Sequence, residues 1–185
     1  PNGDVYAASG FTGVSGTSFA AGLVAGAAAL VKQGHPKFTP AQIKSALVNT
    51  ASSQVLDNGA NAGITAAGAG KLDAGAAVNT TATVEPATVS FGEVGTGVAL
   101  PVNVPLTISN VTSASLRITI QVAPSVQDAL SSVTVSPTSV TLAAGQPHQL
   151  TGQLKGSHPA PGSYEGFFRF PPGSARHTRP CLKCA

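Results

Sequence analysis

The N-terminal part of the chain is organised around GTSFAAGLVAG, residues 16–26. This stretch places a Thr-Ser pair at the head of a small, apolar segment, and no charged residue occurs between Asp4 and Lys32. Three structures fit it: a membrane segment, a buried core helix, or a helix whose first turn presents a reactive serine. The surrounding sequence discriminates among them.

A membrane span is the weakest of the three. The apolar run from Phe19 to Val31 is 13 residues long, whereas a span needs about 20 predominantly apolar residues. A helix that is apolar nearly all round is expected to be buried on all sides. We therefore predict a core helix of a domain larger than the first 78 residues can build. Because the chain also begins with Pro1 rather than Met, we expect it to be part of a longer protein.

Start and stop signals in the sequence give the limits of two predicted helices. The first helix is predicted from about Ser18 to Gln33, with Gly34 just beyond its end and Lys32 in its last turn. The second begins with Thr39 as N-cap, followed by Pro40 at the first helical position.

Gln42 completes a capping box with Thr39, while Phe38 and Ile43 occupy the positions of a hydrophobic staple. A short strand is expected at 4–8. A Gly-rich loop follows the second helix, and a third helix is expected at 72–78 with Asp73 near its start.

The remaining sequence predicts an all-β sandwich. Residues 116–122 alternate apolar and polar side chains, which is typical of a half-buried strand. Further strands are predicted at 104–109, 133–135, 140–142, 149–154 and 164–170, separated by Pro- and Gly-containing turns. One pattern, V-x-P-x-x-V, recurs at 84–89 and 135–140 and indicates two equivalent bends at strand ends.

The predicted fold class is thus an α/β fragment, mainly helical, joined to a β-sandwich. The boundaries are 1–78 for the fragment, 79–82 for a linker, 83–170 for the sandwich and 171–185 for an irregular tail. Only 9% of residues are charged, and the net charge of +3 is scattered. A nucleic-acid surface needs a clustered basic face, so we expect no nucleic-acid partner.

Ser18 is the candidate reactive residue. The first turn of a helix has backbone N–H groups without intrahelical partners, and the positive end of the helix dipole lies there. Both would stabilise an oxyanion that forms beside the serine during acyl transfer. A hydroxyl is a poor nucleophile without a base, so this chemistry also requires a histidine oriented by a carboxylate.

The stretch 16–26 closely resembles the serine motif of subtilisin-like serine proteases, G-T-S-[MF]-A-x-P-x-V-x-G. The stretches PNGDVYAAS (1–9), HPKFTPAQIKSALVNTA (35–51) and GAGKLDAGAAV (68–78) resemble neighbouring segments of that family in the right order. The resemblance implies a serine-type endopeptidase with Ser18 as nucleophile and the Ser18 backbone N–H as one oxyanion donor. It departs from the family at Gly22, where a proline is usual.

The family's catalytic Asp and His precede the serine along the chain, and no matching segment occurs here. His35 lies 17 residues after Ser18, or about 25 Å along one helix, too far to act as base. We therefore expect this chain alone to be inactive. The alternative is a non-catalytic binding or adhesion module, or a degenerate protease, whose β-sandwich is the functional part. The resemblance of residues 83–170 to fibronectin-type-III-like or immunoglobulin-like modules is one of architecture.

Both cysteines, Cys181 and Cys184, fall in the tail. Half a metal site lacks two ligands, and the abrupt change of composition after Phe170 suggests a reading-frame artefact. We expect no metal, no cofactor, a protein or peptide substrate, and secretion from a bacterial source. The sequence carries no signal for an oligomeric state.

Overall fold

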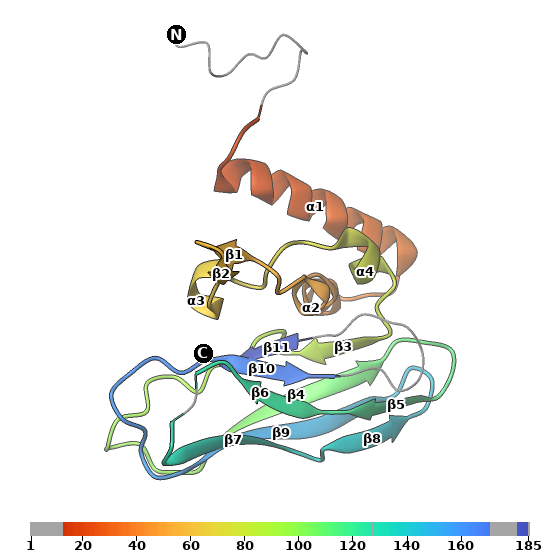
Figure 1. Ribbon diagram of the computed structural model, residues 1–185. Helices are drawn as coiled ribbons and strands as arrows, with labels where there is room; N and C mark the ends of the chain where they lie inside the picture. The colour runs from red at the N-terminus through yellow and green to blue at the C-terminus, as the bar shows by residue number, and fades with distance from the viewer. Residues whose placement is uncertain (1–12, 127, 171–180, 185) are drawn as a thin grey trace, which may run out of the picture.

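The computed structural model describes residues 13–126, 128–170 and 181–184 (Figure 1). The strand expected at 4–8 and most of the expected irregular tail lie outside these residues. Within them, a layer of helices lies on one side of a β-sandwich, and α1 is the helix farthest from the sandwich (Figure 1).

Four helices form this layer in the described part of the chain. They are α1 (Thr17–Gly34), α2 (Pro40–Thr50), α3 (Ile64–Ala67) and α4 (Ala74–Val78). The predicted capping box of α2 is confirmed, because the Thr39 side chain accepts from the Gln42 N–H while the Gln42 side chain accepts from the Thr39 N–H. The third predicted helix is confirmed in shorter form, with Asp73 as the N-cap of α4.

A small hairpin occupies the Gly-rich loop between α2 and α3. Its strands are β1 (Leu56–Asp57) and β2 (Ala60–Asn61), joined by a two-residue turn. The turn residues Asn58 and Gly59 have φ of 50° and 82°, as a type I′ turn requires. The sequence analysis had assigned only a loop here.

The helices pack around a small core. Val31 from α1, Ala46 from α2 and Ala77 from α4 are completely buried, and Phe38 closes the cluster from the α1–α2 connection. Only the C-terminal half of α1 takes part in this core, since Ala27 and Val31 are its buried residues.

The β-part contains one four-stranded, one three-stranded and one two-stranded sheet among the described residues. The orders are β3-β4-β9-β7, β11-β10-β6 and β5-β8. The strands are β3 (Ala82–Glu85), β4 (Val102–Asn110), β5 (Leu116–Thr119), β6 (Gln121–Pro124), β7 (Ser131–Ser136), β8 (Ser139–Leu142), β9 (Pro147–Gly156), β10 (Gly166–Arg169) and β11 (Cys181–Cys184). One buried cluster joins them, and it includes Leu106, Ile108, Leu150 and Phe168.

One predicted strand differs from the structure. Residues 116–122 form not one strand but two, because the chain leaves β8 after Thr119 and pairs with β10 from Gln121 onwards. Ile120, between the two strands, remains buried, so the alternation continues through the switch of sheets. The two V-x-P-x-x-V segments do correspond, since β3 and β7 both end at a cis X-Pro bond, Glu85–Pro86 and Ser136–Pro137.

The helical layer and the sandwich are joined by specific hydrogen bonds. The buried Ser45 hydroxyl of α2 accepts from the Val84 N–H of β3 at 2.7 Å. On another side, the Glu165 carboxylate accepts from the N–H groups of Ile64 and Thr65, at 2.9 and 3.2 Å. The described chain therefore combines a β-sandwich with a few helices that are attached to it at two separate places.

Candidate active site

Ser18 lies in the first turn of α1 and is exposed. Gly16 is the N-cap residue, with φ of 147°, a conformation that residues with a Cβ rarely adopt. Its carbonyl accepts from the N–H groups of both Phe19 and Ala20, each at 3.2 Å. Glycine thus accommodates the backbone conformation that precedes α1, and Ser18 in the first turn is exposed.

The backbone beside Ser18 has the features that an oxyanion needs. As the second helical residue, Ser18 has no carbonyl four residues earlier within the helix to accept its N–H. The first turn of α1 holds no acidic residue, so the positive end of the helix dipole is not neutralised by its own side chains. The arrangement can stabilise negative charge beside the hydroxyl, although activation of the hydroxyl needs a base.

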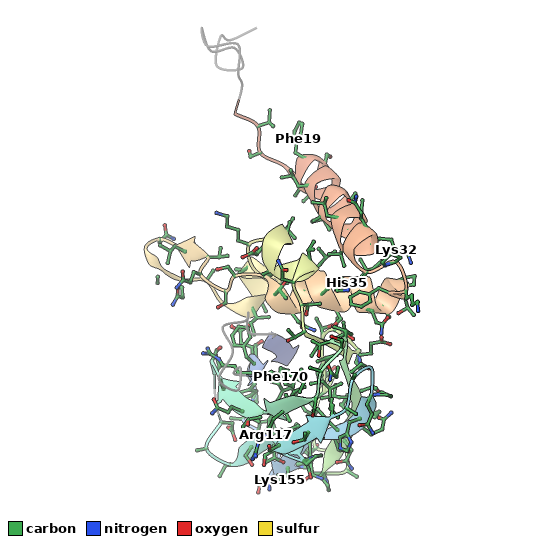
Figure 2. The ribbon with its side chains drawn as sticks, turned by 90° about the vertical axis from the view of Figure 1, so that its right-hand side faces the viewer. Phe19, Lys32, His35, Arg117, Lys155 and Phe170 are labelled. Carbon is green, nitrogen blue, oxygen red and sulfur yellow. The ribbon has the colours of Figure 1, made fainter. Side chains whose placement is uncertain are left out.

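The histidines of the described chain do not supply that base. His35 is the C-cap of α1, at the opposite end of the helix from Ser18, and Figure 2 shows it near Lys32 and far from Phe19. Its Nε2 hydrogen-bonds to the Val78 carbonyl at 2.7 Å, and its ring stacks on Phe38 with centroids 4.2 Å apart. His35 therefore has a structural role at the C-terminal end of α1.

The other histidines lie elsewhere. His148 is on β9, and His158 bonds to the Val98 carbonyl within the sandwich. His177 lies outside the described residues. Among the described residues, no group of three His, Cys, Asp or Glu side chains could hold a metal ion.

The C-terminal end of α1 is held firmly. The Lys32 ammonium donates to the carbonyls of Pro36 and Phe38, at 2.8 and 3.0 Å, and the His35 N–H donates to Val31. The two Lys32 hydrogen bonds tie the last turn of α1 to the connection that leads into α2. The sequence indicated Lys32 as a favourable last-turn residue but not its two carbonyl partners.

The N-terminal half of α1 is uncovered. Phe19, Leu23 and Val24 are 55%, 71% and 44% exposed, and Figure 2 shows Phe19 at the end of the helix that projects from the rest of the protein. A Cβ added at Gly22 would meet no atom within 4 Å. The described structure therefore gives no packing reason for glycine at the position where the serine motif usually has proline.

A second cluster of polar groups lies in the sandwich and was missed by sequence reasoning. Asp128 accepts from the N–H groups of Leu130 and Ser131 and from the Tyr164 hydroxyl. The Leu130 N–H is the main cause that lowers the pKa of Asp128, whereas burial raises the pKa of Tyr164, with the Asp128 charge as the next cause. The two residues are 36 positions apart, and no motif connects them.

Comparison with known proteins relates the region around Ser18 to proteases. Residues 3–83 match the subtilase family, Peptidase_S8. The chain is 58% identical over 52 residues to subtilisin-like protease SBT2.5 of Arabidopsis thaliana and 56% identical over 50 residues to SBT1.9 of the same plant. These alignments cover 28% and 27% of this chain.

The same alignments cover only 6% of each relative's length, so the chain matches a small part of these proteases. Both relatives come from a plant, and the comparison gives no support to the bacterial source expected from the sequence. The N-terminal part of this chain is thus similar to a segment of subtilisin-like serine proteases.

Solved structures give a weaker likeness. A C. elegans member of the MSP family, WR4, covers 57% of this chain and 96% of its own, at 13% identity and a TM-score of 0.39. The PapD-like domain 7 of human CEP192 covers 57% of this chain and 82% of its own, at 13% identity and a TM-score of 0.42. Among the helices that the structure describes, none combines the length and apolarity needed to cross a membrane.

Proposed function

We propose that this chain carries the nucleophile segment of a secreted, subtilisin-like serine endopeptidase. Ser18 is the nucleophile, and its own N–H is one donor to the oxyanion. The observation that carries the proposal is the exposed Ser18 in the first turn of α1, within the residues that match the subtilase family.

The uncovered half of α1 supports the same proposal. Phe19, Leu23 and Val24 are exposed apolar side chains in the same half of α1 as Ser18, and burying such side chains gives roughly 1.5–3 kcal/mol each. A segment that packs on this surface would also stand close enough to Ser18 to present a histidine. We propose that the catalytic Asp and His, with the rest of the protease domain, come from a segment upstream of this chain.

It follows that the chain by itself does not hydrolyse peptides. The domain boundaries at 78 and 83 and the assignment of residues 83–170 to a fibronectin-type-III-like or immunoglobulin-like module belong to the same proposal. Two hydrogen-bonded attachments, Ser45 to Val84 and Glu165 to Ile64, favour a module that supports the helical layer over a loose spacer.

The test is casein hydrolysis by a longer gene product that includes the proposed upstream segment. Activity is expected in that protein and not in the 185-residue chain. Ser18→Ala is expected to abolish it, while Ser15→Ala, an exposed neighbouring serine, leaves it intact. Equal activity of the Ser18→Ala protein would refute the assignment.

The alternative is a binding module with a degenerate protease segment. One observation favours it, a cavity of about 940 Å³ in the sandwich. Inactivity of the longer, folded protein together with ligand binding in the sandwich would support this alternative.

A further inference from the structure

A cavity opens at one end of the β-sandwich, between the loop after β3 and the loop before β10. Its volume is about 940 Å³, at the upper end of the ~300–1,000 Å³ typical of ligand sites. The two loops lie side by side in Figure 1, and the His158 Nε2 hydrogen-bonds to the Val98 carbonyl at 2.9 Å across them.

Two edge strands line the cavity. β6 contributes Val122 and Pro124, and β7 contributes residues 131–133. Among the described strands, β6 pairs only with β10 and β7 pairs only with β9. Each strand therefore has a backbone edge without a described partner strand, and such an edge can pair with an extended polypeptide.

The wall of the cavity is largely apolar. Phe91, Val94, Leu154 and Phe167 contribute to it, and Val126 is 46% exposed there. Binding of an occupant's apolar side chains against this wall would be favourable, because it removes apolar surface from water. This composition is typical of sites that take apolar groups and orient them with a few polar ones.

The charge of the cavity is opposite to that of the chain. Glu93, Asp128 and Glu165 line it, which are three of the seven acidic residues, and no Lys or Arg is among the lining residues. The whole chain carries a net charge of +3. Charge complementarity thus favours a cationic occupant.

The three carboxylates are not equivalent. Asp128 accepts hydrogen bonds on both oxygens, including those of the Leu130 N–H and the Tyr164 hydroxyl, and Glu165 is bonded to the N–H groups of Ile64 and Thr65. Glu93 is exposed, and none of the hydrogen bonds found in the described part of the chain involves it. Glu93 is consequently the carboxylate best placed to pair with an incoming cation.

We propose that this cavity binds an extended polypeptide segment in which a lysine or arginine lies between apolar side chains, with Glu93 as the partner of the cation. The apolar residues of the segment occupy the wall, and its backbone pairs with the edge of β6 or β7. The proposal is independent of Ser18 and of the proposed protease activity.

The test is fluorescence anisotropy with the full 185-residue chain and three labelled, end-blocked peptides. The first has the sequence GSLVRVLSG, the second has glutamate in place of arginine, and the third has serine in place of its leucines and valines. Saturable binding is expected for the first peptide only. Glu93→Gln is expected to weaken that binding about tenfold, as for the loss of one charge-assisted hydrogen bond.

Asp57→Asn is the matched control, because it removes an exposed carboxylate from β1, outside the cavity. Both variants are checked for unchanged circular dichroism and melting. Equal binding of the arginine and glutamate peptides, unchanged affinity in Glu93→Gln, or no binding of the arginine peptide at millimolar concentration would each overturn the proposal. Slower amide exchange at 121–123 or 131–133 on peptide addition supports the edge-strand mode, and unchanged exchange in both refutes it.

Discussion

Replacement of Ser45 by alanine tests how the helical layer is attached to the sandwich. Ser45 is completely buried, and its hydroxyl accepts from the Val84 N–H at 2.7 Å and from the Asn49 side-chain amide at 3.0 Å. Val84 is itself completely buried, on the edge strand of the four-stranded sheet. Ser45→Ala leaves this N–H without its acceptor in a place that water does not reach, which costs about 1–3 kcal/mol.

Urea unfolding followed by circular dichroism measures the effect. The expected result is a loss of about 1–3 kcal/mol in the free energy of unfolding, with the Val84 amide among those whose hydrogen exchange accelerates. Ser53→Ala, at an exposed position between α2 and β1, is the control and is expected to stay within about 0.5 kcal/mol of the parent chain. A Ser45→Ala protein as stable as that control would show that the hydrogen bond does not hold α2 to β3.

Three further perturbations follow from the structure. Glu165→Gln removes the carboxylate that accepts from the Ile64 N–H, and faster amide exchange is expected at Ile64 because charged acceptors make the stronger hydrogen bonds. Gly70→Ala places a Cβ against the Ser52 carbonyl oxygen at φ of 108°, and a loss of at least ~1 kcal/mol is expected in urea unfolding. Asp128, whose pKa is lowered from 3.8, stabilises the fold above that pH and loses this contribution as the pH falls through its folded pKa. Asp128→Asn is therefore expected to flatten the acid limb of the stability curve.

Each of these has a result that contradicts it. Unchanged amide exchange at Ile64 in Glu165→Gln would show that the Glu165 carboxylate does not hold the start of α3 to the sandwich. Gly13→Ala, with nothing within 4 Å, is the control for Gly70→Ala, and equal stability of the two would contradict the close approach. An acid limb in Asp128→Asn as steep as in the parent chain would show that the ionised carboxylate contributes nothing to the pH dependence.

Local signals were sufficient where the structure is determined by neighbours in sequence. The α2 capping box was predicted because its partners lie within three residues. Asp73 was predicted near the start of the third helix, and the structure makes it the N-cap of α4. The hairpin at 56–61 was missed although Asn58-Gly59 is a strong turn signal, since its strands are only two residues long.

Features that depend on contacts between residues far apart in the chain could not be predicted from local sequence patterns. The break between β5 and β6 is invisible in the alternation of 116–122, because Ile120, the residue between the two strands, is buried and the apolar residues before and after it are buried or half-buried. The contact of Glu165 with Ile64 joins residues 101 positions apart, and no local pattern predicts it. For the candidate site, the sequence predicted the helix that presents Ser18, and the role of Ser18 stays a prediction.

The most direct test of that role is covalent labelling with a fluorophosphonate probe, read by peptide mass spectrometry. In a longer gene product with the proposed upstream Asp and His, the account predicts one adduct on Ser18, absent in Ser18→Ala, and no adduct in the 185-residue chain alone. A folded longer protein that remains unlabelled at Ser18, or a label on Ser18 in the isolated chain, would contradict it.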